Sequence, residues 1–302
     1  KIKKGMQRYK GGHSFTLLLS DQTGNTVDYK YWGPEDEEKV RKLYDSIPAD
    51  SVLHIQARMN TYNGKLQMAA SEPLTAEALK PGQFDVDAFV KPAKKDINKM
   101  FDGLKEAIGF VSDPNIKLLL TKIFTDSEIE AKFRKHPGAI SIHHNWTGGL
   151  LQHTLEVLNY CILSHKQFPE LNKDLLIAGA LLHDIGKLEE IEVTTRIKGS
   201  EKGQLIGHLP LGMLFVSKKM DEIDSFDNDL KNKILHMLAS HHGRLEYGTP
   251  KEPMIPEAIA LYYADEMSSK IAEFTELVSE SKSKTEDSFM YSPRHARNIF
   301  LR

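Results

Sequence analysis

The sequence predicts a chain of two parts, a small β-barrel followed by an all-α domain. Three observations support this fold class. Apolar and polar side chains alternate over roughly the first 70 residues, which is typical of half-buried strands. Proline and glycine interrupt every period between residues 73 and 96. From Asp96 onward, apolar residues recur at helical spacing.

The N-terminal part contains short strands joined by tight turns. Residues 13–20, 26–32 and 51–60 each alternate apolar and polar side chains, and a short helix is expected over residues 35–44. Asn63-Gly64 is a strong signal for a two-residue hairpin turn. Several short strands with one helix between them predict a small barrel.

The rest of the chain is predicted to be helical. We assign residues 1–80 to the barrel, 81–95 to a linker and 96–302 to the helical domain. Helices are expected near residues 96–111, 113–125, 126–135, 148–168, 174–188, 210–222, 227–241 and 255–280. We expect Asp174 to be an N-cap, and residues 279–288, which are polar, to form a mobile loop.

Composition narrows the class of protein. The 302 residues are 40% hydrophobic and 27% charged, with a formal net charge of −2, so nucleic acid would have to be bound by a local basic surface. Cys161, the only cysteine, lies in an apolar stretch and is expected to be a buried thiol in a helix. No apolar run is long enough to span a membrane, and Lys1–Lys10 lack the core of a signal peptide. We therefore expect a cytoplasmic protein, and leave open whether residues precede Lys1.

A histidine and an aspartate stand side by side in an apolar helix. His183-Asp184 follows Leu181-Leu182 and precedes Ile185. Burying an imidazole and a carboxylate is costly unless they are paired or bind a metal. Both can reach one metal that lies at the edge between them, and the carboxylate can bridge to a second. The alternative for this pair alone is a cap at the end of a helix.

Further polar groups interrupt apolar helices in the same region. These ligand candidates are His153, His208, His241, His242 and Asp265. Each alone is more often a satisfied core or capping group. Together with His183 and Asp184 they supply enough nitrogen and oxygen ligands for two divalent metal ions, with Asp184 as the bridge. Iron, cobalt or nickel would suit so many histidines equally well, and whether both His241 and His242 bind metal stays open.

This ligand series resembles the HD superfamily of metal-dependent phosphohydrolases, and the additional histidines resemble its dinuclear members. Residues 143–154, His-His-Asn-Trp-Thr-Gly-Gly-Leu-Leu-Gln-His-Thr, are more narrowly similar to YhaM-type 3′-5′ exoribonucleases. His241-His242-Gly243, followed by Glu246-Tyr247-Gly248 and Glu257-Ala258, is similar to them as well. The resemblance covers most of the chain. It implies an OB-fold nucleic-acid-binding domain before the HD domain, and Mn²⁺ or Mg²⁺ as the metal.

Three polar residues in or near the ligand series are candidates for catalytic roles. Asp184, Lys187 and His144 are candidate catalytic residues: Asp184 bridges the metals, Lys187 neutralises a phosphate oxygen, and His144 contacts the scissile phosphate or protonates a leaving oxygen. The alternatives are a surface lysine at a helix end and a loop histidine. Met267-Ser268-Ser269-Lys270 stands where many family members have Leu-Asp-Ala-Lys, so the lysine is retained and the second acid is not.

Aromatic and basic residues mark candidate contacts to nucleic acid. The candidates are Phe15, Tyr31, Trp32, Arg58 and Arg244, because single-strand binders combine stacking rings with cations. Additional candidate phosphate contacts are Lys3, Lys4, Arg8, Lys10 and Lys30. The alternatives are that the aromatic rings fill the barrel and that Arg244 is a solvated loop charge.

Three functions are compatible with these features. The first is a metal-dependent phosphodiesterase that trims single-stranded RNA from the 3′ end, with DNA as an open alternative substrate. The second is a phosphohydrolase of small or cyclic nucleotides with a regulatory OB domain. The third is a non-enzymatic RNA-binding protein, against which the complete ligand set argues. A homo-oligomer is compatible with the sequence.

Overall fold

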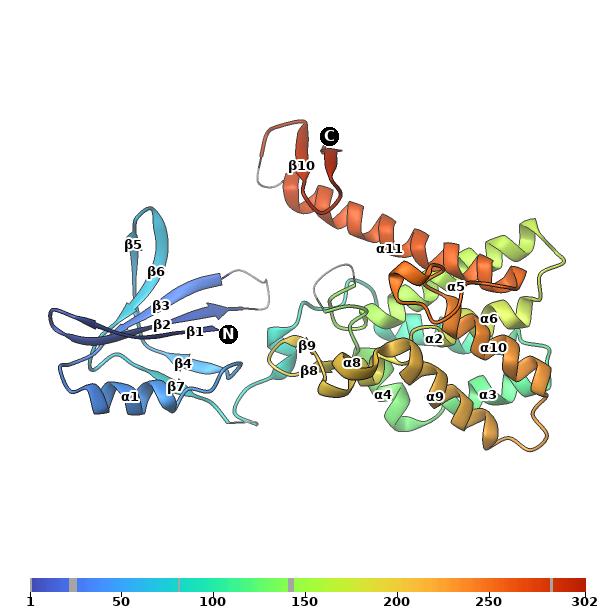
Figure 1. Cartoon of the computed structure of the whole chain (residues 1–302), viewed down its shortest axis with the longest axis horizontal. Helices are drawn as coiled ribbons and strands as arrows, with labels where there is room; N and C mark the ends of the chain where they lie inside the picture. The colour runs from blue at the N-terminus through green and yellow to red at the C-terminus, as the bar shows by residue number, and fades with distance from the viewer. Residues whose placement is uncertain (1, 22–25, 81, 141–143, 283–284) are drawn as a thin grey trace. The chain divides into compact units, whose positions relative to one another are not determined.

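The computed structural model describes residues 2–21, 26–80, 82–140, 144–282 and 285–302 (Figure 1). Contacts divide the chain into two units, Lys1–Pro92 with Val193–Arg196, and Ala93–Glu192 with Ile197–Arg302. The predicted domain boundaries at residues 80 and 95 stay predictions. The first unit extends to Pro92 and also includes Val193–Arg196, which the sequence analysis assigned to the helical domain. His143 and the side chains of Lys3 and Lys4 lie outside the described part of the chain.

The first unit is built on a sheet. Its elements are β1 (Ile2–Tyr9), β2 (Gly12–Ser20), β3 (Thr26–Trp32), α1 (Glu37–Asp45), β4 (Leu53–Ile55), β5 (Arg58–Tyr62), β6 (Lys65–Ala70), β7 (Ala76–Ala78) and a 3₁₀ turn, η1 (Val86–Phe89). The main sheet has the order β1-β2-β3-β6-β5, in which β3 and β6 are parallel and the other neighbours antiparallel. The strand predicted over residues 51–60 is interrupted, since β4 pairs with β7 and β5 with β6.

The predicted alternation places one face of this sheet in the core. Phe15, Leu17, Tyr29 and Tyr31 are buried, and the Phe15 and Tyr31 rings stack with centroids 5.2 Å apart. The predicted hairpin turn is confirmed: Tyr62 pairs with Lys65, and the intervening Asn63 and Gly64 both have positive φ, as a type I′ turn requires. The alternation of the sequence therefore reflects a sheet with one buried face.

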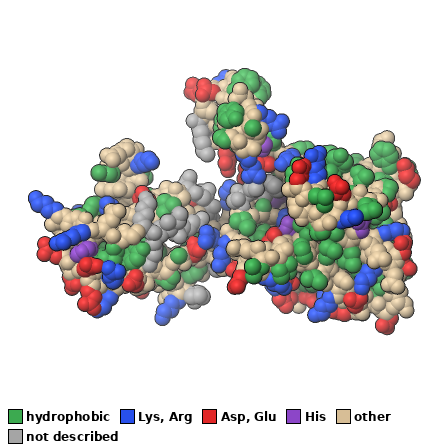
Figure 2. All heavy atoms as spheres, in the orientation of Figure 1, with side chains coloured by type: hydrophobic (Ala, Val, Ile, Leu, Met, Phe, Trp, Pro, Cys, Tyr) green, Lys and Arg blue, Asp and Glu red, His purple; other side chains and the backbone are tan. Residues whose placement is uncertain are grey.

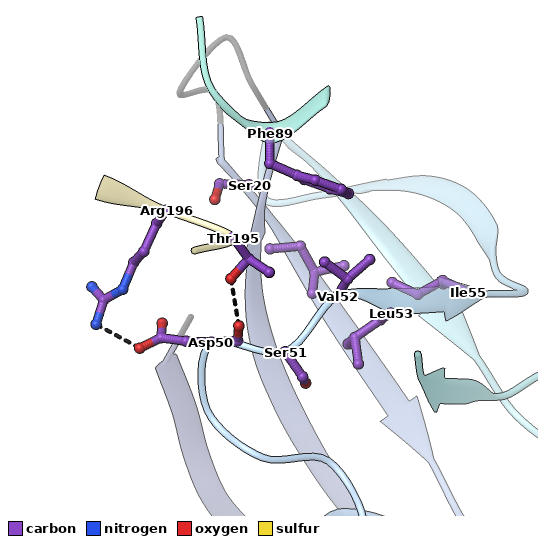
Figure 3. A pocket seen from close by; sticks show the side chains of 10 residues that line it. Ser20, Asp50, Ser51, Val52, Leu53, Ile55, Phe89, Thr195 and Arg196 are labelled. Carbon is purple, nitrogen blue, oxygen red and sulfur yellow. Dashed lines mark hydrogen bonds and ion pairs between the residues drawn. The ribbon is translucent and has the colours of Figure 1, made fainter. Parts of the chain in front are cut away.

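In the part of the chain that the structure describes, the sheet does not close on itself, so the small barrel expected from the sequence stays a prediction. Within the described residues no ladder joins β1 to β5, so the sheet has two free edges. A small cavity lies at one end of the same unit, lined by Val52, Leu53 and Phe89 (Figure 3). At its rim, Arg196 forms an ion pair with Asp50, with the two side chains 2.5 Å apart.

The second unit is mainly helical. Its helices are α2 (Ile97–Gly109), α3 (Pro114–Phe124), α4 (Ser127–Lys135), α5 (Gly149–Gln167), α6 (Lys173–Leu182), α7 (Lys187–Glu190), α8 (Glu201–Ile206), α9 (His208–Asp221), α10 (Asn228–Ser240), the 3₁₀ turn η2 (Leu245–Tyr247) and α11 (Pro256–Lys282). Two hairpins that the sequence did not predict are β8 (Ile191–Val193) with β9 (Ile197–Gly199), and β10 (Phe289–Ser292) with β11 (Arg297–Phe300). None of the described helices is long and apolar enough to cross a membrane.

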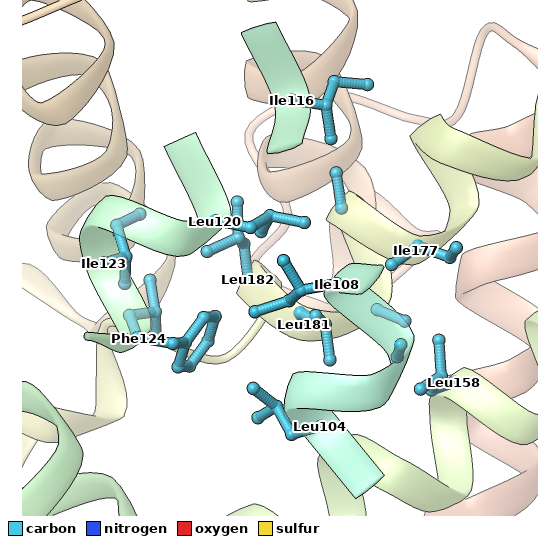
Figure 4. Close-up of a cluster of buried hydrophobic side chains, with 14 of the residues drawn as sticks. Leu104, Ile108, Ile116, Leu120, Ile123, Phe124, Leu158, Ile177, Leu181 and Leu182 are labelled. Atoms are coloured by element: carbon cyan, nitrogen blue, oxygen red, sulfur yellow. The ribbon is translucent and has the colours of Figure 1, made fainter. Parts of the chain in front are cut away.

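Apolar side chains from several helices form the core of this unit. Leu104 from α2, Leu120 and Phe124 from α3, and Leu182 from α6 are buried there (Figure 4). Cys161 lies on α5 and is also buried, which confirms the predicted buried thiol, and burial raises the pKa of this thiol to about 12. On the face in Figure 2, basic and acidic side chains are interspersed on both units.

Two helix boundaries differ from the prediction. The N-cap of α6 is Asn172, whose side chain accepts from the N–H groups of Asp174 and Leu175. The Asp174 carboxylate instead accepts from the N–H groups of Ser112 and Asp113, so it ties the start of α3 to α6. The helix predicted over residues 174–188 ends at Leu182, and the chain turns before α7.

Candidate metal centre

The ligand candidates converge from three helices and from the turns after α6 and α10. His153 lies on α5, His208 is the first residue of α9, and Asp265 lies on α11. His183 and Asp184 follow the end of α6, and His241 and His242 follow the end of α10. Helix ends thus bring most of these side chains together. His208 starts α9 rather than preceding it, because Pro210 is tolerated in a first helical turn, where an N–H is not needed.

The first cluster joins His153, His183 and the two aspartates. The Nε2 atoms of His153 and His183 are 3.2 Å apart. Asp184 Oδ2 lies 3.3 Å from His183 Nε2 and 3.5 Å from His153 Nε2, and Asp265 Oδ1 lies 3.1 Å from His153 Nε2. His153, His183 and Asp184 are almost fully enclosed, whereas 15% of the Asp265 side chain is exposed.

The second cluster contains His208, His241 and His242. The Nε2 atoms of His208 and His242 are 3.2 Å apart, and the His241 ring lies beside both, with centroids 5.8 Å from His208 and 4.5 Å from His242. One ligand atom from each of the three histidines lies within 4.8 Å of the others. This geometry allows both His241 and His242 to reach one ion.

Asp184 stands between the two clusters. Its Oδ2 faces His153 and His183, whereas its Oδ1 lies 3.6 Å from His208 Nε2 and 3.8 Å from His241 Nε2. One carboxylate therefore directs a separate oxygen to each group of histidines.

Close packing of two chain segments holds this arrangement. A Cβ on Gly186 would lie 2.0 Å from the carbonyl oxygen of His208 and 2.6 Å from the N–H of Gly212. Only glycine permits this approach, which places the start of α9 against the turn that carries Asp184. Glycine at position 186 thus lets His208 of the second cluster lie close to Asp184.

The other nitrogen of each histidine is held by the protein. Nδ1 of His183 donates to the carbonyl oxygen of Ala180, and Nδ1 of His241 to that of Leu238. Nδ1 of His208 donates to the Glu190 carboxylate, 3.0 Å away. Such bonds fix the ring orientation and leave the Nε2 lone pair for a ligand.

The donor set fits a divalent metal ion. His241 Nε2 is fully buried, and among the described residues it has no hydrogen-bond partner, which is costly for a nitrogen that could otherwise be solvated. Neutral imidazoles and carboxylates are ligands for divalent transition metals. The fit is therefore good for His241 and its neighbours, which could hold an ion.

A buried ion pair sets the charge at this centre. Lys187 Nζ donates to Asp184 Oδ2 at 2.7 Å. Burial raises the pKa of Asp184, but Lys187 and His183 outweigh it and hold the pKa well below its usual range. Burial lowers the pKa of Lys187, but Asp184 outweighs it and the pKa is raised. Lys187 is therefore a cation directed at the ligand cluster.

His144 lies beside the first cluster. Its ring is buried, with its centroid 5.2 Å from that of His153, and its Nε2 lies 3.1 Å from Glu156 Oε2. His144 has a φ of 59°, in the left-handed region.

The sequence analysis missed three residues that contact the histidines. Glu190 binds His208, Ser268 Oγ lies 3.1 Å from His153 Nδ1, and Glu156 accepts from Ser268. Spacing carried a signal for two of them, because Glu156 follows His153 and Ser268 follows Asp265 by three residues, which places each pair on one helix face.

The nucleic-acid candidates occupy different environments. Phe15 and Tyr31 are buried in the core of the sheet, so neither ring has a free face for a base, and burial removes them from the candidate contacts. Trp32 is half-buried, with Lys30 Nζ 4.1 Å from its ring centroid, and Arg58 is exposed. Arg244 is exposed, 3.2 Å from the Glu246 carboxylate and near the Tyr247 ring.

Comparison with known proteins matches the chain to one domain family and to relatives that share one name. The HD domain family matches residues 150–270. The 3′-5′ exoribonuclease YhaM of Bacillus subtilis is 29% identical over 258 residues, which cover 85% of this chain and 78% of the relative. The protein of the same name from a Geobacillus species is 31% identical over 258 residues, covering 85% and 76%, and that from Bacillus licheniformis 28% over 256 residues, covering 85% and 78%. No solved structure matches the chain.

Proposed function

The chain belongs to the YhaM family of 3′-5′ exoribonucleases, and we propose that it degrades single-stranded RNA with two divalent ions held around Asp184. It is a metal-dependent 3′-5′ exonuclease with an HD domain. RNA as the substrate, Mn²⁺ or Mg²⁺ as the metal and the number of ions are the further parts of the proposal.

One observation carries the proposal. Asp184 directs Oδ2 to His153 and His183, and Oδ1 to His208 and His241. A carboxylate in this position can bridge two ions. In the proposed site, His153, His183 and Asp265 hold one ion, and His208, His241 and His242 hold the other. When bound, such ions stabilise negative charge on the oxygens of a transferring phosphoryl group.

The chain's own residues provide the remaining chemistry. Lys187 offers a buried cation, which we assign to a phosphate oxygen near Asp184. His144, adjacent to His153, is assigned to the scissile phosphate or the leaving oxygen. These interactions would strengthen as negative charge develops on the reacting group.

The sheet unit is proposed to be an OB-like strand-binding domain of residues 1–80, with a linker over 81–95 and the HD domain over 96–302. The order β1-β2-β3-β6-β5, with a helix after β3 and a parallel β3–β6 pair, supports this assignment. OB folds are partly open five-stranded barrels that bind single strands. Trp32, with Lys30 against its ring, and the exposed Arg58 are the proposed contacts.

End-labelled strands test this function. We expect a 5′-labelled RNA of about twenty nucleotides, incubated with Mn²⁺, to shorten progressively. A 3′-labelled strand should release labelled mononucleotide at once. Release of labelled mononucleotide from the 5′ label first would contradict the direction. Hydrolysis restricted to mononucleotides or cyclic nucleotides would favour the small-nucleotide alternative.

A further inference from the structure

Three side chains connect a proposed metal ligand to a carboxylate. Ser268 Oγ lies 3.1 Å from His153 Nδ1 and 3.0 Å from Glu156 Oε2. His153 and Glu156 lie on α5, and Ser268 lies on α11, which packs against it. Ser268 and His153 are each 2% exposed, so water competes little for these contacts.

Hydrogen-bond chemistry fixes the direction of each bond. An ionised carboxylate only accepts, so Ser268 donates its proton to Glu156. The Ser268 oxygen is then an acceptor for His153, which must carry its proton on Nδ1. The His153 Nε2 is left as a lone pair, and it faces His183, Asp184 and Asp265.

Other contacts keep Glu156 ionised and in place. Gln152 Nε2 donates to Oε1 at 2.9 Å, His144 Nε2 lies 3.1 Å from Oε2, and Lys95 Nζ is 3.5 Å from Oε1. Burial raises the pKa of Glu156, but the hydrogen bonds from His144, Gln152 and Ser268 outweigh it, and the pKa is about 2. The carboxylate is therefore charged at neutral pH.

We infer that Glu156 is a positioning residue that acts through Ser268 to set the tautomer and orientation of His153. The inference rests on the proposed metal centre. Partners of this kind, which hold a metal-binding histidine from behind, typically contribute 10–100-fold to metal affinity or activity. The same carboxylate also contacts His144, whose ring lies beside that of His153, so one anion contacts His144 directly and His153 through Ser268.

Mn²⁺ binding to the full-length, chelator-treated protein tests this inference, measured by calorimetry alongside circular dichroism. Ser268→Ala removes the relay and should weaken Mn²⁺ binding at the His153 cluster by roughly 10–100-fold. Glu156→Gln combined with Ser268→Asp removes the distant carboxylate and supplies one directly to His153. This double variant should bind Mn²⁺ within about threefold of the parent. Ser164→Ala, on α5, is the matched serine-to-alanine control and should leave Mn²⁺ binding unchanged, because Ser164 Oγ donates to the carbonyl oxygen of Tyr160 on its own helix.

The outcomes separate the two levels of the proposal. A parent protein that binds no Mn²⁺ overturns the metal centre and the inference with it. A parent that binds Mn²⁺ while Ser268→Ala binds equally well overturns only the relay. Weakened binding in both Ser268→Ala and the double variant also overturns it, because the site then needs a serine and not a carboxylate-oriented imidazole. Weakened binding in the first and recovery in the second support the inference, even if Ser268→Ala is less stable.

Discussion

Replacing Asp184 by asparagine removes one negative charge while keeping the side-chain shape. The charge has two roles in the structure, because one oxygen pairs with Lys187 at 2.7 Å and both oxygens face histidine clusters. Asp184→Asn should therefore lower both the stability of the fold and the affinity for metal.

The structure gives a magnitude for the loss of stability and for the loss of hydrolysis in Asp184→Asn. Leaving a buried charge without its partner costs about 3–5 kcal/mol, and we expect the lower end because Lys187 keeps 16% of its side chain exposed. Hydrolysis should fall by more than about 100-fold, since even residues that contact a metal ligand indirectly contribute 10–100-fold and Asp184 is proposed to touch both ions.

A second substitution separates stability from chemistry. In Asp184→Asn/Lys187→Met no unpaired ammonium remains, so the free energy of unfolding in urea should return to within about 1 kcal/mol of the parent. Shortening of 5′-labelled RNA should stay undetectable. Lys187→Met alone is the control and should retain bound Mn²⁺ while losing activity. If the double variant hydrolyses RNA within tenfold of the parent at saturating Mn²⁺, Asp184 does not bridge the ions.

His208→Ala should lower bound Mn²⁺ from two per chain to one, more than His153→Ala does, because only His208 belongs to the additional cluster; metal analysis after dialysis measures this. Trp32→Ala should raise KM for a long single strand by about 5- to 150-fold, from stacking worth roughly 1–3 kcal/mol per base, with bis-p-nitrophenyl phosphate hydrolysis unchanged. Burial lowers the pKa of His136 from 6.5 to about 4. Between pH 6.5 and 4 the unfolded chain binds a proton at His136 that the folded chain does not, so the free energy of unfolding should be highest above pH 6.5 and fall as pH falls toward 4. His136→Gln should flatten this pH dependence in urea titrations.

Each of these expectations has a clear contrary result. A single Mn²⁺ in the metal-replete parent would remove the basis for the His208 comparison. An unchanged KM in Trp32→Ala across salt concentrations would exclude this ring as a strand contact. Equal pH dependence in His136→Gln and the parent would show that another group governs acid stability between pH 4 and 6.5.

Periodicity in the sequence was sufficient to predict strands and their buried residues where a segment has one buried face. Phe15, Leu17 and Tyr29 alternate because a strand repeats every two residues, and they form the core of the sheet as predicted. The short hairpins β8–β9 and β10–β11 were not predicted, because strands of three or four residues contain too little alternation. The missing barrel closure depends on an edge pairing, which no local pattern encodes.

The ligands of the proposed site were visible because buried histidines and aspartates are chemically conspicuous. Their orientation was not, because it depends on contacts distant in sequence: Ser268 and Glu156 are separated by 112 residues. Spacing places Glu156 on the helix face of His153, and Ser268 on that of Asp265, but the hydrogen bond between Glu156 and Ser268 becomes visible only when α5 and α11 are placed together. Asp174 shows the same limit, since its N-cap position was taken by Asn172.

The number of Mn²⁺ ions bound per chain tests the central claim most directly. The full-length protein is treated with a chelator, dialysed against a series of Mn²⁺ concentrations and analysed for metal and protein in the same sample. The two histidine clusters joined by Asp184 predict a plateau at two ions per chain, and a plateau below two in Asp184→Asn. A plateau at one ion or none in the parent protein would contradict the bridged two-ion site.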